Sequence, residues 1–214
     1  MEQKGLFITF EGSEACGKST QIKMLAERLS SLKIHPLILR EPGGTEAGEV
    51  IRHLLQHAPQ GEALTPEAEL LLFAASRAQL VREKILPALA ADGVVICDRF
   101  LDSTTVYQGV ARRIPAGETD RINSFAVGDC LPDITFLLDL DPEVSFSRMK
   151  KDSRMPDRIE RESVEFFNAV RSGYLALASQ NPHRIQTLDA SRPAEHLAEE
   201  IFKCVQAAIE RKTC

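Results

Sequence analysis

The sequence predicts an α/β fold of three layers, in which a five-stranded parallel sheet is flanked by helices. Two observations support this: short apolar runs alternate with longer segments of helical periodicity, and some runs, such as Val-Val-Ile-Cys at residues 94–97, are apolar throughout. Strands separated by helices pair in parallel through right-handed crossovers, and fully apolar strands suit a sheet covered on both faces. The chain has 214 residues, 43% of them hydrophobic, so we predict a single domain at residues 1–214.

Five strands are predicted from apolar runs that end in polar residues. They lie at residues 6–10, 36–39, 94–97, 134–140 and 184–188. The polar segments that follow them lie at residues 11–19, 40–44, 98–99, 141 and 189–191. Because ligands bind beyond the carboxyl ends of parallel strands, we expect the functional site to be built from these segments.

The helices between the strands are predicted from the spacing of apolar residues. Such residues recur every three or four positions at residues 18–32, 46–56 and 193–211. A longer helical stretch, residues 66–91, contains Pro87. Because proline has no N–H to donate inside a helix, we expect a kink near it.

A glycine-rich segment between the first strand and the first helix matches the pattern G-x-x-x-x-G-K-[ST]. Its residues are Gly12, Ser13, Glu14, Ala15, Cys16, Gly17, Lys18 and Ser19, followed by Thr20. The glycines permit close approach of the backbone, and the N–H groups of such a loop bind phosphate oxygens at the helix N-terminus. We expect Lys18 to reach the outer phosphates of ATP and the Ser19 hydroxyl to hold Mg²⁺. The segment predicts the P-loop NTPase fold.

A P-loop leaves the class of nucleotide enzyme open. A GTPase would carry an N-K-x-D loop, and no lysine follows any asparagine in this sequence. A motor or transport ATPase usually has a strand ending in Asp-Glu, whereas the third strand here ends in Asp98-Arg99. Asp98 could bind Mg²⁺ through water and Arg99 could reach an acceptor phosphate, although a surface ion pair is the alternative interpretation.

Several segments together resemble the thymidylate kinase family. In chain order they are residues 11–20, Arg40-Glu41-Pro42-Gly43-Gly44-Thr45, Phe73-Ala74-Ala75-Ser76-Arg77, Asp98-Arg99-Phe100, Tyr107-Gln108-Gly109 and Asp157-Arg158-Ile159-Glu160. The resemblance covers nearly the whole chain, and the Arg-Glu-Pro-Gly-Gly-Thr run is typical of bacterial members. It implies transfer of the γ-phosphoryl group of ATP to dTMP with Mg²⁺, for dTTP biosynthesis.

Two alternatives to this activity differ in class. One is another nucleoside-monophosphate or deoxynucleoside kinase with a relaxed acceptor site. The other is a nucleotide-binding regulatory module that has lost turnover. The intact Lys18, Ser19, Asp98 and Arg99 argue against the second alternative.

The resemblance implies an acceptor site between the long helix and the segment after Asp98. Phe73 is expected to stack on thymine, and Arg77, one helical turn later, to contact the base. Core packing is the alternative for Phe73. The remaining residues implied at the base and the deoxyribose are Ser103, Thr104, Tyr107 and Gln108, for which a helix cap and a solvated turn are the alternative.

The acceptor phosphate is expected to lie between two arginines. The resemblance implies that Arg40 and Arg99 grip it, with Glu11 also in the dTMP site. Cationic groups from two loops help to bring two anionic groups together. The turn that starts at Glu41 is expected to aim Arg40.

The basic segment at residues 148–158 resembles the lid that closes over ATP in monophosphate kinases. Some family members carry an arginine in the P-loop at the position of Ala15, but this chain has no basic residue between Gly12 and Gly17. We therefore expect the lid to supply the catalytic arginine, with Arg154 as the first choice. The alternatives are Arg148, Lys151 and Arg158, or a solvated basic face without a catalytic role.

Three further residues carry smaller expectations. Ala15 implies a backbone angle that a Cβ tolerates. Cys16, near a helix N-terminus, is either a thiol of altered reactivity or a small space-filling residue. Arg192 lies in a segment that borders adenine in the family, and is expected to cover the base.

Composition limits the partners and the compartment. The net charge of −5 argues against a general nucleic-acid binder. The first apolar stretch, residues 6–10, is too short for a signal-peptide core or a membrane span. Five scattered cysteines suit free thiols in the cytoplasm. The family resemblance further implies a homodimer formed through helices that include the long one.

Overall fold

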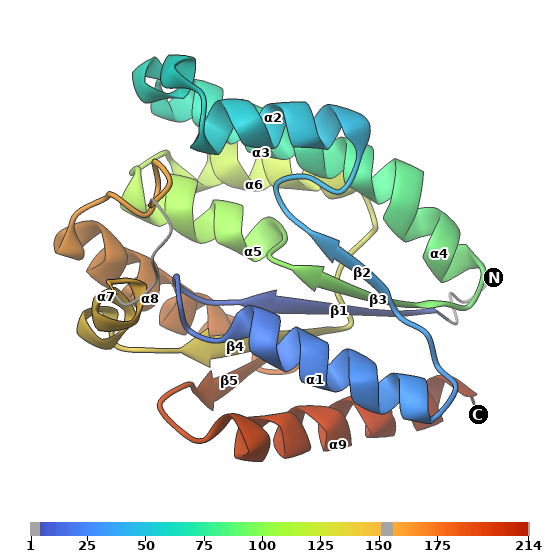
Figure 1. The fold of residues 1–214 in the computed structure, drawn as a ribbon. Helices are drawn as coiled ribbons and strands as arrows, with labels where there is room; N and C mark the ends of the chain where they lie inside the picture. Colours follow the sequence, from blue (N-terminus) through green and yellow to red (C-terminus); the bar gives the residue numbers. More distant parts are fainter. Residues whose placement is uncertain (1–4, 151–155, 214) are drawn as a thin grey trace.

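A computed structural model describes residues 5–150 and 156–213 of the chain. Its centre is a five-stranded, fully parallel sheet of order β2-β3-β1-β4-β5, flanked by helices (Figure 1). The strands are β1 (Leu6–Glu11), β2 (Leu37–Arg40), β3 (Val94–Asp98), β4 (Ile134–Asp139) and β5 (Ile185–Asp189). The predicted fold class is confirmed, and each predicted strand lies within one or two residues of the observed one.

One face of the sheet is covered by α1 (Lys18–Ser31) and α9 (Ala194–Thr213), which lie side by side beneath it in Figure 1. Side chains of β1 alternate between the two faces because successive residues of a strand point to opposite sides. Leu6, Ile8 and Phe10 pack into the core under α1 and α9, whereas Phe7 packs into the core on the other face. Both faces of the central strand are therefore buried, as its sequence predicts.

The predicted long helix is present as three consecutive segments. They are α3 (Pro66–Leu80), the π-helical turn η2 (Val81–Ile85) and α4 (Leu86–Ala90). The irregularity falls on the turn before Pro87, because the proline ring clashes with the carbonyl group four residues earlier and a widened turn relieves that clash. The kink expected near this proline thus takes the form of a π-helical turn.

The other helices pack on the same face as α3 or beside the site. These are α2 (Glu46–Gln56), as predicted, the 3₁₀ segment η1 (Pro59–Ala63), α5 (Leu101–Thr104), the π-helical η3 (Thr105–Ala111), α6 (Ala116–Val127), α7 (Pro142–Met149) and α8 (Val164–Gln180). The helix α8 buries Val170 and Tyr174 against Leu137 of β4 and against η3. Its packing places η3 over the carboxyl end of the sheet.

Polar residues close all five strands at one edge of the sheet. The last residues of the strands are Glu11, Arg40, Asp98, Asp139 and Asp189. The parallel registers pair Arg40 with Asp98 and Asp139 with Asp189, so these ends lie side by side. No helix in the described part of the chain is long and apolar enough to cross a membrane.

Candidate active site

The P-loop joins β1 to α1 and requires glycine at two positions. Gly12 and Gly17 have positive φ angles of 136° and 100°, and a Cβ on Gly12 would lie 2.5 Å from the carbonyl oxygen of Leu138. Lys18, only 7% exposed, donates from Nζ to the carbonyl oxygens of Gly12 at 3.2 Å and Ser13 at 2.8 Å. No side chain of residues 5–150 or 156–213 caps the N-terminus of α1, so its first N–H groups can bind an anion beside this amine.

Ala15 and Cys16 precede the second glycine of the loop. Ala15 has φ of 51°, a left-handed angle that a Cβ tolerates at a cost of roughly 1 kcal/mol. Cys16 is buried in the core with α1, and its Sγ accepts a weak hydrogen bond from Lys18 Nζ at 3.6 Å. Its burial favours the space-filling interpretation of Cys16 over a reactive thiol.

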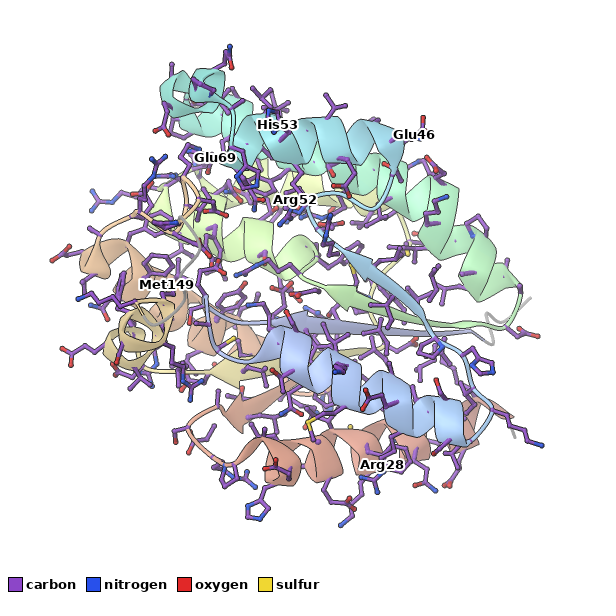
Figure 2. All side chains as sticks on the ribbon, in the orientation of Figure 1. Arg28, Glu46, Arg52, His53, Glu69 and Met149 are labelled. Atoms are coloured by element: carbon purple, nitrogen blue, oxygen red, sulfur yellow. The ribbon has the colours of Figure 1, made fainter. Side chains whose placement is uncertain are left out.

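A cavity of about 740 Å³ opens beyond the carboxyl ends of β1, β2 and β3. This volume lies in the range typical of small-molecule sites. Many of the predicted site residues line it together: Glu14, Ala15, Cys16, Gly17, Lys18, Ser19, Thr20, Arg40, Phe73, Asp98, Arg99, Ser103, Thr104, Tyr107 and Gln108. Arg52 of α2 and Met149 of α7, both labelled in Figure 2, line it from opposite sides.

Arg99 is held at the inner wall of this cavity. Its guanidinium donates to Glu14 Oε1 at 2.5 Å and to the carbonyl oxygen of Gly12 at 3.0 Å, and it lies over the Tyr107 ring. The charge of Glu14 raises the pKa of Arg99, although burial opposes ionisation. The backbone of Arg99 is left-handed, with φ of 68°. The arginine is thus a permanent, preorganised cation beside the P-loop.

Glu11 lies beneath Arg99 and does not line the cavity among the described residues. Its carboxylate accepts from the Phe100 N–H at 2.7 Å, from the Ser103 hydroxyl at 2.6 Å and from the Tyr174 hydroxyl at 2.8 Å. Burial raises the pKa of this carboxyl group, and the nearby charge of Asp102 adds to the effect. Glu11 therefore organises the segment after β3.

Arg40 at the end of β2 is paired with Glu49 of α2. Two hydrogen bonds of 2.9 and 3.0 Å join its guanidinium to the two carboxylate oxygens, and Glu49 Oε1 also accepts from the Gly44 N–H at 2.7 Å. The turn between them has positive φ angles at Gly43 and Gly44. Arg52 donates to the carbonyl oxygen of Pro42 in the same turn. The turn thus aims two arginines at the cavity.

Arg77 lies behind the cavity wall, with 1% of its surface exposed. Its donors contact Glu41 Oε2, Thr104 Oγ1 and Asn123 Oδ1 at 2.8, 2.9 and 3.0 Å, and the Phe100 carbonyl oxygen at 3.2 Å. Arg77 therefore orients Thr104, which does line the cavity.

Comparison with known proteins identifies this constellation. A family model described as thymidylate kinase matches residues 10–201. The chain belongs to the thymidylate kinase family. Members of this family phosphorylate dTMP to dTDP with ATP.

Individual relatives agree over nearly the full length. A thymidylate kinase of Pelotomaculum thermopropionicum is 45% identical over 207 residues, which is 97% of this chain and 95% of the relative. One of Pseudomonas fluorescens is 45% identical, covering 97% of this chain and 98% of the relative. One of Kosmotoga olearia is 43% identical, covering 92% and 94%. The resemblance inferred from motifs is confirmed.

Other predicted residues of this kinase lie away from the cavity lining. Arg192, in the loop before α9, donates to the exposed Glu200 of that helix at 3.0 Å, and Gly12 and Ser13 present backbone carbonyl oxygens to Lys18 in the P-loop. Phe73 lines the cavity and is absent from the three core clusters of the described residues, which favours a ligand contact over core packing. The roles of Arg77 and Arg192 at the two bases stay predictions.

The two described candidates of the lid make different contacts. Arg148 donates to the carbonyl oxygens of Ala15 and Ala190, at 3.2 and 3.3 Å, and so bridges the P-loop and the loop after β5. Arg158 donates to the Leu55 carbonyl oxygen at 2.9 Å and to Glu69, and is anchored to α2 and α3. The preferred candidate, Arg154, and its alternative Lys151 lie outside the described residues.

Several functional side chains were missed at the level of sequence. Arg52 lines the cavity, Tyr174 and Glu69 hold residues that line it, and Asn123 holds Arg77 behind the cavity wall. Arg52 lies within a predicted helix, whereas the site was expected in the polar segments that follow the strands. Tyr174 lies among apolar residues of α8, which favours a core position. A charged residue on an otherwise apolar helical face, as at Glu69, is the one signal that could have been used.

Proposed function

We propose that this chain transfers the γ-phosphoryl group of ATP to dTMP in the cavity, giving dTDP and ADP. The observation that carries this proposal is that Lys18, Asp98 and Arg99 line the same cavity as Phe73. Lys18 and the N-terminus of α1 bind the phosphates of ATP. Arg99 binds the phosphate group of dTMP, which faces them. The acceptor phosphate is itself the nucleophile, so positioning and charge stabilisation supply most of the catalysis.

The acceptor nucleotide lies along α3 and the segment after β3. Phe73 stacks on the base, and Thr104, Gln108 and Ser103 contact its edge and sugar side. Tyr107 packs against the deoxyribose while its ring keeps Arg99 in place. Arg77 acts on the base from behind Thr104, which its guanidinium contacts at 2.9 Å.

The acceptor phosphate meets two arginines that have carboxylate partners in the structure. Arg40 is paired with Glu49 and Arg99 with Glu14. The acceptor phosphate would compete with these carboxylates for the guanidinium donors and would place its negative charge between the two arginines. Glu11 fixes the position of the segment that carries Arg99, because it accepts from the Phe100 N–H.

The residues present fit a magnesium ion. Ser19 Oγ and Asp98 Oδ2 lie 3.3 Å apart at the cavity wall, and both are hard oxygen ligands of the type that Mg²⁺ prefers. Phosphate oxygens and water would supply the other ligands of the ion. Bound Mg²⁺ neutralises charge on the transferred group.

The lid and the loop after β5 are assigned to the donor nucleotide. Arg154 supplies the last positive charge on the transferred phosphoryl group, and Arg192 covers adenine. The bridge from Arg148 to the backbone at Ala15 and Ala190 supports a basic segment that closes over this side. If an Arg154→Ala variant keeps the wild-type kcat, Arg154 has no role in phosphoryl transfer.

The acceptor assignment predicts a preference that a coupled ADP assay measures. With ATP and Mg²⁺, the value of kcat/KM for dTMP should exceed those for dCMP and dGMP by at least about tenfold, since a polar pocket rejects a mismatched base. It should also exceed that for UMP, because Tyr107 against the deoxyribose leaves no room for a 2′-hydroxyl group. Equal values over the panel would favour the alternative of a relaxed nucleoside-monophosphate kinase.

We also infer that the chain works as one domain and as a homodimer in the cytoplasm. Exposed apolar side chains on three adjacent helices support a self-contact: Val50 of α2, Leu71 of α3 and Phe125 of α6, the last 84% exposed. The described cysteines are free thiols, which suits a reducing compartment.

A charge on this surface tests the homodimer. Phe125→Glu should convert the dimer to a monomer in sedimentation equilibrium. Leu32→Glu, at an exposed apolar position after α1, is the matched control and should leave the mass unchanged. A wild-type chain that sediments as a monomer at all concentrations contradicts the inference.

A further inference from the structure

Two helical rows of side chains face each other across one end of the cavity. On α3, Glu69, Phe73 and Arg77 are spaced by four residues and share one face. On the opposite segment, Thr104 and Gln108 are also four residues apart. Phe73, Thr104 and Gln108 line the cavity, whereas Glu69 and Arg77 lie behind it, 2% and 1% exposed. Each buried charge contacts a lining side chain of the opposite segment.

The contact at Glu69 is a hydrogen bond from the amide of Gln108. Gln108 Nε2 lies 2.8 Å from Glu69 Oε1, and the same carboxylate accepts from Arg112 at 3.2 Å and from Arg158 (Figure 2 labels Glu69). Burial opposes the ionisation of Glu69, but the bond from Gln108 and the two arginines outweigh it and lower its pKa. Glu69 is therefore a carboxylate that can only accept hydrogen bonds.

An acceptor that cannot donate sets the orientation of the amide beside it. Only the NH₂ group of Gln108 can face Glu69, because a flipped amide would place its carbonyl oxygen against the carboxylate. Among the described residues, no hydrogen bond ends on Gln108 Oε1. The carbonyl oxygen of Gln108 is thus available to accept a hydrogen bond from a ligand in the cavity.

The contact at Arg77 sets the hydroxyl of Thr104 in the same way. Arg77 Nη1 lies 2.9 Å from Thr104 Oγ1. A guanidinium has no acceptor, so the hydroxyl oxygen must accept from it, and the proton of the hydroxyl is left to donate elsewhere. The cavity edge beside Phe73 therefore offers one donor, at Thr104, and one acceptor, at Gln108.

This polarity matches one class of pyrimidine. Thymine and uracil present a carbonyl acceptor at position 4 next to an N–H donor at position 3, whereas cytosine presents an amino donor next to a nitrogen acceptor. We propose that Glu69 is a positioning residue that determines specificity, because it holds the Gln108 amide in the orientation that accepts from the N3–H of a 4-oxo pyrimidine and opposes the orientation that cytosine needs. The inference rests on the proposed function, in which the base lies on Phe73.

The test is the ratio of kcat/KM for dTMP to that for dCMP in a Glu69→Gln variant. The replacing amide can donate or accept, so Gln108 becomes free to flip. The ratio should fall by about tenfold, mostly through a gain for dCMP, since one matched pair of hydrogen bonds contributes discrimination of this order. A folded variant with an unchanged ratio overturns the proposal.

Arg112→Gln is the matched control for disturbance of the ion-pair network. Arg112 contacts the same carboxylate and also Glu162, but it has no contact with Gln108 among the described residues. Its removal should change the melting temperature and leave the dTMP to dCMP ratio within about twofold. If the dTMP to dCMP ratio falls as much as in Glu69→Gln, the cause is a general disturbance of the ion-pair network, and the proposal is overturned.

A second variant serves if Glu69→Gln does not fold. Gln108→Leu keeps the ion pairs of Glu69 and removes the amide, so the ratio should again fall by about tenfold; an unchanged ratio overturns the proposal. Failure of the proposed function is a separate outcome, because it appears in the wild-type protein as the absence of any preference for dTMP over dCMP.

Discussion

Replacing Lys18 by alanine is expected to lower kcat for dTMP phosphorylation by about 10²- to 10³-fold. Its amine is held at the P-loop by the carbonyl oxygens of Gly12 and Ser13, in the cavity that also contains Arg99. A preorganised charge at this position stabilises negative charge that develops on the transferred phosphoryl group, and alanine supplies none.

The fold should survive this substitution. The core under α1 is made by Ile22, Leu25 and Leu29, which the substitution does not touch. The free energy of unfolding in urea should therefore change by less than about 1 kcal/mol, while single-turnover phosphorylation falls. Lys23→Ala is the control on the same helix, since Lys23 is exposed and pairs only weakly with Glu27. Equal kcat for Lys18→Ala and the wild type would refute the P-loop role.

Replacing Arg77 by leucine is expected to lower the free energy of unfolding by about 3–5 kcal/mol at pH 8. Arg77 is the partner of the buried Glu41, at 2.7 Å, and it also satisfies Thr104 and Asn123. Removing one member of a buried ion pair leaves the other charge without compensation, which costs far more than the pair contributes.

The destabilisation should grow with pH. Burial raises the pKa of Glu41 from its ordinary value of 4.5 to about 7, and Arg77 opposes that rise. A carboxyl group with a raised folded pKa contributes stability that is present below pH 4.5 and is lost as pH rises through the folded value. Without Arg77 the folded pKa rises further, so the difference from wild type should be small near pH 5 and largest above pH 7.

Urea unfolding of both proteins over pH 5–8 checks this expectation. Arg82→Leu, on the continuation of the same helix, is the control, because within the described part of the chain Arg82 contacts backbone carbonyl oxygens and no buried carboxylate. The double variant Arg77→Leu, Glu41→Gln should recover part of the loss at pH 8, since no charge is left buried. A destabilisation that is independent of pH would mean that packing, and not the charge of Glu41, dominates.

Local patterns explain most of the agreement between the predicted and the observed fold. The five strands, α1 and α2 were found because each has an apolar periodicity that can be read within about ten residues. The short helices α5 and η3 were not delimited, because the sequence from Leu101 to Ala111 is mixed and the π-helical geometry of η3 breaks the regular period.

The site residues that belong to sequence motifs were predictable, and the contacts that depend on packing between distant segments were not. Lys18 and Ser19 follow from the P-loop pattern, whereas the partners Glu14 and Arg99 are 85 residues apart. Glu69 and Gln108 meet across 39 residues only because α3 packs beside η3. No periodicity within one segment encodes such a contact.

By itself, the sequence determined the parallel α/β sheet, the phosphate-binding loop and the family, because each depends on residues that are close together in the chain. Only the tertiary structure decided which side chains face the cavity and which stand behind it. Phe73 faces the cavity, while Arg77 on the same helical face is buried against Glu41 and Thr104. The physical reason is that a buried charge must find partners, and the packing of distant helices decides where those partners are.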